Sequence, residues 1–85
     1  MSTALNITSP KVLKNAPGTV LTATVVHPGS GPGIICDCAT TGVAAAENQV
    51  ASVPAAVGTY QIDFPCLVGI VVVPGPGQTL AVSFE

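Results

Sequence analysis

The chain has 85 residues, of which 48% are hydrophobic and 7% are charged, and its formal net charge is −2. Lys11 and Lys14 are its only lysine or arginine residues, which excludes the extended cationic surface that nucleic-acid binding requires. The longest apolar run, residues 67–73, is far shorter than the about 20 residues of a membrane helix, so we expect no membrane partner.

The scarcity of charge is the most informative feature of the composition. A typical globular domain carries about a quarter charged residues, whereas this chain has two basic and four acidic residues and a mean hydropathy of +0.67. Its surface must therefore consist largely of Thr, Ser, Ala, Val, Gly and Pro, and such a surface tends to associate with others. Because a domain of this length is only marginally stable alone, we expect residues 1–85 to form a single β domain that works in an assembly.

Segments of alternating apolar and polar residues lie between turns that are rich in Gly and Pro. This period-two alternation is typical of β-strands with one buried face, and it predicts strands over residues 4–14, 18–27, 33–38, 57–64, 67–73 and 78–84. Pro10 indicates an edge or a bulge within the first strand. The turn at residues 74–77, Pro-Gly-Pro-Gly, is expected to join the last two strands in a hairpin.

The Ala-rich segment 43–53 follows a different pattern. Its apolar residues recur at helical spacing, Thr40 or Thr41 is a suitable cap, and Pro54 marks an end. We expect two to three turns of helix lying over one sheet edge. The alternative is an extended loop whose alanines pack against a neighbouring element.

These elements predict an all-β fold, a compact antiparallel sandwich or small barrel of about six short strands with one short Ala-rich helix or loop. The alternation also predicts which side chains face the core. They are Leu21, Ala23, Val25, Tyr60, Ile62, Phe64, Leu80, Val82 and Phe84.

The cysteines form the one cluster that suggests chemistry. Cys36 and Cys38 point to the same face if their segment is a strand, and Cys66 follows the strand that ends near residue 64. A metal site would need His27 or Asp37 as a fourth ligand, and Cys-x-Cys is a weak zinc spacing. A Cys38–Cys66 disulfide is a second interpretation. We favour a third, in which the thiols are small buried hydrophobic groups, so we expect no metal and no cofactor.

No set of residues predicts catalysis. His27 is the only histidine and has no carboxylate near it in the sequence, and Asp63 lies on the outward side of an alternating strand, so an acid–base pair with Asp37 is not expected. The Gly-rich loop at residues 29–33 lacks the following Lys-Ser/Thr of a phosphate loop. We therefore expect that the protein is not an enzyme.

Several short patterns together resemble small all-β virion proteins of tailed bacteriophages. They are Val-Leu-Thr-Ala-Thr-Val at 20–25, Pro-Gly at 32–33, Asp-Cys-Ala at 37–39, Asn-Gln-Val at 48–50 before the Pro54 stop, and Gly-Ile-Val-Val at 69–72 running into Pro-Gly-Pro-Gly-Gln-Thr at 74–79. The resemblance covers about residues 18–84 and consists of turn and strand patterns. It implies a compact all-β capsid decoration or cement protein, or a part of a head or tail fibre, with no catalytic residues.

We therefore expect a structural virion protein, in the first place a capsid decoration or cement protein that assembles on a bacteriophage particle and stabilises it. A head or tail fibre component is one alternative, and a small metal- or thiol-binding protein using Cys36, Cys38 and Cys66 is another. The expected partners are other copies of the chain, as a trimer, and a major capsid or other virion protein. Because the N-terminus lacks the pattern of a signal peptide, we expect synthesis in the host cytoplasm and location in the virion.

Overall fold

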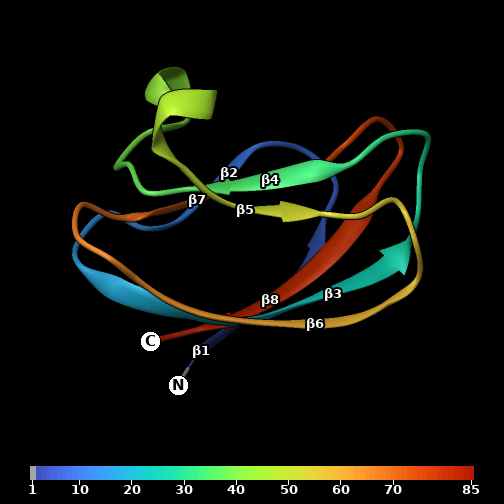
Figure 1. The fold of residues 1–85 in the computed structure, drawn as a ribbon, viewed down its shortest axis with the longest axis horizontal. Coiled ribbons are helices and arrows are strands. Elements are labelled where there is room, and N and C mark those ends of the chain that lie inside the picture. Colours follow the sequence, from blue (N-terminus) through green and yellow to red (C-terminus); the bar gives the residue numbers. More distant parts are fainter. Residues whose placement is uncertain (1) are drawn as a thin grey trace.

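Alternating and Val-rich segments form two antiparallel four-stranded sheets that pack face to face (Figure 1) in the computed structural model, which describes residues 2–85. Sheet I has the strand order β1 (Ser2–Ile7), β8 (Thr79–Phe84), β3 (Gly18–His27) and β6 (Gly58–Cys66). Sheet II has the order β2 (Lys11–Lys14), β7 (Ile70–Val73), β4 (Gly33–Cys36) and β5 (Gln49–Val53).

The topology is that of one long hairpin folded over on itself. Strand β1 pairs with β8, β2 with β7, β3 with β6 and β4 with β5, so that partners lie about equally far on either side of Gly42. Additional pairing of β3 with β8 and of β4 with β7 completes the two sheets. The resulting orders, β1-β8-β3-β6 and β2-β7-β4-β5, define an eight-stranded jelly roll.

The predicted all-β sandwich is confirmed, but two details of the strand prediction are wrong. The structure has eight strands, because the predicted strand 4–14 forms two strands in different sheets, separated around Pro10, and residues 49–53 form a further strand. Proline has no backbone N–H to donate to a ladder, so a break at this residue is favoured. The described strands also do not close into a barrel, since β1 and β6 are the two edges of sheet I and β2 and β5 those of sheet II.

The predicted hairpin at residues 74–77 is also wrong, because this turn crosses from β7 in sheet II to β8 in sheet I. Its backbone runs against the loop at residues 28–33: Ser30 N donates to Pro76 O at 2.9 Å. A Cβ atom at Gly75 would lie only 2.1 Å from Gly31 O, so only glycine fits there. The sequence therefore identifies the turn itself. The sheet that each flanking strand joins depends on strands far away in the sequence, which local patterns do not reveal.

The predicted helix over residues 43–53 does not form. Two short 3-10 turns, η1 (Thr41–Val43) and η2 (Ala46–Asn48), lead into edge strand β5. The Asn48 side chain accepts a hydrogen bond from Ala45 N at 2.9 Å and donates one to Val43 O at 2.7 Å. Such side-chain bonds compete with helical backbone bonds, and the Val-rich end of the segment gains a ladder with β4 instead.

A core of mostly branched aliphatic side chains fills the space between the sheets. Its fully buried members are Ile7, Val20, Ala23, Val25, Ile35, Val53, Cys66, Ile70, Val72, Leu80 and Val82. Of the side chains predicted to face inward, Ala23, Val25, Leu80 and Val82 are buried. Three more, Tyr60, Ile62 and Phe84, are partly buried and pack against the core.

Two of the predicted core residues deviate because bulges shift the alternation. Leu21 is the extra residue of β3 between the pairs Val20–Phe84 and Thr22–Ser83, so Val20 takes the fully buried position and Leu21 is only half-buried. Along β6 the pairing jumps at Asp63, whose φ is +50°, and Phe64 beyond it is 42% exposed. A bulge inserts one residue and so moves the following side chains out of phase.

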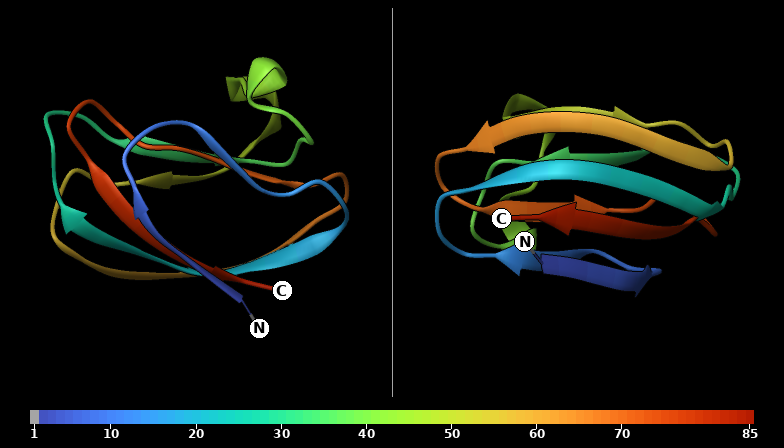
Figure 2. Two further views of the ribbon diagram at one scale, coloured as in Figure 1. Left: turned by 180° about the vertical axis from the view of Figure 1, so that it is seen from behind. Right: turned by 90° about the horizontal axis from the view of Figure 1, so that it is seen from below.

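A smaller apolar cluster lies on the outer face of sheet II. It consists of Cys36, Cys38 and Val71, with Ile34, Ala44 and Val73 packed against them. The segment containing the two 3-10 turns arches over this face (Figure 1). The outer face of sheet I has no such cover, as Figure 2 (right) shows. Among residues 2–85, no helix has the length and apolar character to cross a membrane.

We predict that Leu80→Ala lowers the free energy of unfolding by about 2–5 kcal/mol, because Leu80 is fully buried between the sheets. The matched control is Leu5→Ala, which removes the same atoms from a side chain that is 71% exposed and is expected to cost less than about 1 kcal/mol. Urea denaturation of the two variants measures both effects. Equal losses would contradict the assignment of the core.

Candidate interaction surfaces

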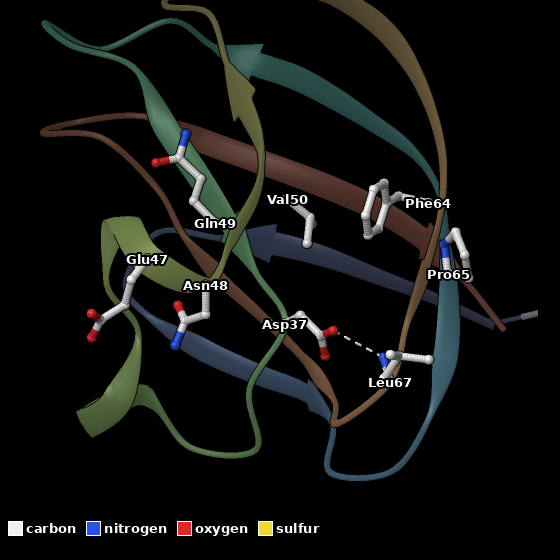
Figure 3. Close-up of a pocket in the computed structure, with 8 residues that line it drawn as sticks. All are labelled: Asp37, Glu47, Asn48, Gln49, Val50, Phe64, Pro65 and Leu67. Carbon is white, nitrogen blue, oxygen red and sulfur yellow. Dashed lines mark hydrogen bonds between the residues drawn. The ribbon is translucent and has the colours of Figure 1, made fainter.

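Asp37 accepts more hydrogen bonds than any other charged side chain in the described part of the chain. It directly follows β4, and its carboxylate accepts backbone hydrogen bonds from Leu67 N at 2.9 Å, Val68 N at 2.8 Å and Gly69 N at 3.2 Å, the first of which is drawn in Figure 3. These residues form the turn between β6 and β7, which passes from sheet I to sheet II. Burial raises the pKa of Asp37, but the three N–H donors outweigh this effect and hold the pKa below its ordinary value.

Asp37 therefore has a structural role, as an anchor of the turn. It does not share a site with Asp63, which lies on β6 and accepts a hydrogen bond from Gln61 Nε2 at 2.5 Å. Within residues 2–85, no group of three or more His, Cys, Asp or Glu side chains is arranged to hold a metal ion. Sequence analysis weighed Asp37 as a ligand or an acid and missed the anchoring role, for which the only signal was its position between two strands.

The three cysteines are buried free thiols that lie in two different apolar regions. Cys36 and Cys38 share the outer cluster of sheet II, as their spacing predicted, whereas Cys66 belongs to the core between the sheets. Burial, together with the nearby charges of Asp37 and Cys38, raises the pKa of Cys66 to about 11. Burial, followed by the charge of Cys38, also raises the pKa of Cys36, although a hydrogen bond to Ala45 O opposes this. Thiols of this kind are protonated and unreactive at neutral pH.

The side chains of His27 and Gln78 stabilise one end of the sandwich. His27 is exposed, and its Nδ1 donates to Gly77 O at 3.1 Å, which ties the end of β3 to the turn before β8. At the same end, the Gln78 side chain is buried; its Oε1 accepts from Gly75 N at 2.9 Å and its Nε2 donates to Pro54 O at 3.0 Å. Sequence analysis missed Gln78, because nothing in its local pattern distinguishes it from a surface glutamine.

A shallow groove of about 450 Å³ opens beside the edge strands β5 and β6 (Figure 3). Its lining has an apolar part, Val50, Phe64, Pro65 and Leu67, and a polar part, Asp37, Glu47, Asn48 and Gln49. Phe64 and Leu67 of this lining are 42% and 77% exposed, so the groove presents two large apolar side chains to solvent. The groove is therefore a candidate contact site for another chain.

The outer face of sheet I is the second candidate surface. Its hydroxyl groups bond to one another, with Thr22 Oγ1 at 2.6 Å from Ser83 Oγ and Thr24 Oγ1 at 3.0 Å from Thr59 Oγ1. A hollow of about 130 Å³ on this face is lined only by uncharged residues, namely Thr3, Leu5, Thr22, Thr24, Ala81, Val82 and Ser83. Because these four hydroxyls already bond to one another, covering them loses little hydrogen bonding.

Comparisons with protein-family models, with curated proteins and with solved structures yield no match to this chain.

We predict that Asp37→Asn lowers the free energy of unfolding at neutral pH by about 1–2 kcal/mol, because a charged acceptor of three backbone N–H groups is lost and the site is partly exposed. The carboxylate contributes fully above its unfolded pKa of about 4, and this contribution disappears as the pH falls through the lower folded pKa. The difference between wild type and variant should therefore narrow in acid. Denaturation of both proteins at several pH values measures this.

Asp63→Asn is the matched control for this experiment. It makes the same change at a carboxylate bonded only to the Gln61 side chain, and Asn tolerates the left-handed backbone at this position. A loss as large as that of Asp37→Asn, or a difference that does not narrow in acid, would contradict the anchoring role.

We predict that the three thiols of the native protein react slowly with a thiol reagent at pH 8 and rapidly after unfolding, because all three are buried and the pKa of Cys66 is about 11. A Cys38–Cys66 disulfide, which the sequence left open as a second interpretation, is not formed in the structure, where all three cysteines are free. The mass of the protein as isolated tests it. Three titratable thiols in denaturant match the structure, whereas one thiol and a mass lower by two hydrogens would establish a disulfide.

Proposed function

We propose that the chain is a structural virion protein of a tailed bacteriophage, a capsid decoration or cement protein that binds the assembled particle and stabilises it. The observation that carries the proposal is the uncovered outer face of sheet I, where Thr and Ser hydroxyls pair with each other and no charge lines the central hollow. Removing water from a face of this kind costs little free energy, so the face suits permanent contact with a large protein surface.

The topology gives further support. Jelly rolls of eight strands are frequent in viral capsid proteins, although the fold also occurs in lectins and cupins and does not by itself specify a function. Cupin chemistry requires ligands inside the sandwich, whereas the buried core here is apolar except for cysteine thiols. The resemblance of the turn and strand patterns to phage virion proteins is consistent with the same proposal.

The size of the face indicates how the protein would bind. The molecule measures 29 × 25 × 17 Å, and the outer face of sheet I, seen in Figure 2 (right), spans the 29 and 17 Å directions. Several joined copies present this face several times, so they would bind a particle more firmly than one copy, through multivalency. This favours an oligomer on the particle.

The two alternatives receive less support. A head or tail fibre component would use the same surfaces, and it differs from a decoration protein only in its place on the particle. A metal- or thiol-binding protein would need accessible, reactive sulfur ligands, whereas Cys36, Cys38 and Cys66 are buried and divided between two apolar clusters.

The test uses purified particles of the phage that encodes the chain. We expect the protein in these particles by mass spectrometry, on the capsid shell by electron microscopy, and we expect particles without it to open at a lower temperature. Thr24→Lys places a charge on the outer face of sheet I and should abolish cosedimentation with particles that lack the protein. Thr41→Lys, the same change on the opposite side of the molecule, should not. Absence of the chain from the particles would overturn the proposal, and a place on the tail would select the fibre alternative.

A further inference from the structure

Charges of opposite sign lie on or beside the two edge strands of sheet II. Strand β2, one edge, contains Lys11 and Lys14, which are all the lysines of the chain. Strand β5, the opposite edge, begins two residues after Glu47 and lies beside the groove that Glu47 and Asp37 line. The sheet therefore has a basic edge and an acidic edge.

Both edge strands also have backbone N–H and C=O groups that pair with no neighbouring strand. Strands β2 and β5 are four and five residues long, so their lengths match. All three pairings in the sheet are antiparallel, and a sheet of four such strands has edges that run in opposite directions. If a second copy lies beside the first in the same orientation, its β2 is therefore antiparallel to β5, and the ladder continues.

Apolar side chains flank the same two edges. Val12 of β2 is 37% exposed, and the groove beside β5 presents Val50, Phe64 and Leu67. Contact between the edges would cover these groups together with the backbone. In this arrangement Lys14, at the end of β2, lies level with the start of β5 and so near Glu47, in an environment with less water, where opposite charges attract more strongly.

We infer that a second copy of this chain occupies the β5 edge, with the β2 edge of one copy beside the β5 edge of the next. A two-fold contact of β2 with β2 is disfavoured by charge, because the antiparallel strands bring Lys11 of one copy beside Lys14 of the other. The inference rests on the proposed function, since it names the contact that joins the subunits on the particle.

A head-to-tail contact has a defined consequence for the assembly. It uses two different surfaces of each copy, and it generates a closed ring when the rotation between copies closes and an open filament when it does not. Copies in the same orientation form an open row, and the outer faces of sheet I in such a row all face the same way, as multivalent binding requires.

Charge reversal tests the contact. Lys14→Glu places two carboxylates opposite each other at the contact, and Glu47→Lys places two amines there, so each variant alone should associate at least about tenfold more weakly than wild type. A one-to-one mixture should regain association, because each junction between the two variants pairs one carboxylate with one amine at these positions. The control Glu85→Lys makes the same reversal at the exposed C-terminus and should associate like wild type. Sedimentation velocity over a concentration series measures association, and circular dichroism verifies folding.

The outcomes separate this inference from the proposed function. Recovery on mixing supports the head-to-tail contact. Wild-type association that neither reversal weakens, or two weakened variants that do not recover on mixing, would overturn it and leave particle binding intact. A wild type that stays monomeric yet cosediments with particles would also overturn only the inference. A chain that neither associates nor occurs in particles would overturn both.

Discussion

The burial of aliphatic side chains between two sheets is the interaction on which the rest of the structure depends. Only β4 and β5 pair with a neighbour in the chain, whereas β1, β2 and β3 find their partners in the last third of the sequence. Pairing between such distant segments loses much chain entropy before it gains stability. The inner faces of both sheets must therefore meet before most ladders are stable, and core residues such as Val25 and Leu80 provide this contact.

The few polar groups in or near the interior serve the connections that this topology requires. A jelly roll crosses repeatedly from one sheet to the other, and each crossing leaves backbone groups without a strand partner. Asp37 satisfies three N–H groups at the crossing from β6 to β7, and Gln78 joins two loops at the opposite end. In the described chain, every buried side-chain nitrogen or oxygen has a partner. The polar side chains in and near the interior therefore stabilise the fold.

The scarcity of charged residues also leaves surfaces that favour association. With Asp37 used internally, the exposed charges gather at sheet edges and at the C-terminus, and the outer face of sheet I has hydroxyls bonded to one another. The proposed particle contact uses that face, and the proposed contact between copies uses the edges of the other sheet. These two surfaces are distinct, so one copy can engage a particle and two neighbours at the same time.

The sequence by itself determined the all-β class and the positions of the Gly/Pro turns, because alternation and Gly/Pro placement are local properties of the chain, and it left a sandwich and a small barrel as alternatives. It also determined that the surface is poor in charge and that the cysteines lie among apolar groups. The tertiary structure alone decided that residues 4–14 divide between two sheets, that residues 49–53 form a strand and that the turn at 74–77 is a crossover. Each of these depends on a partner far away in the sequence. The bulges at Leu21 and Asp63, and the anchoring roles of Asp37 and Gln78, likewise arise only where sequence-distant backbones meet.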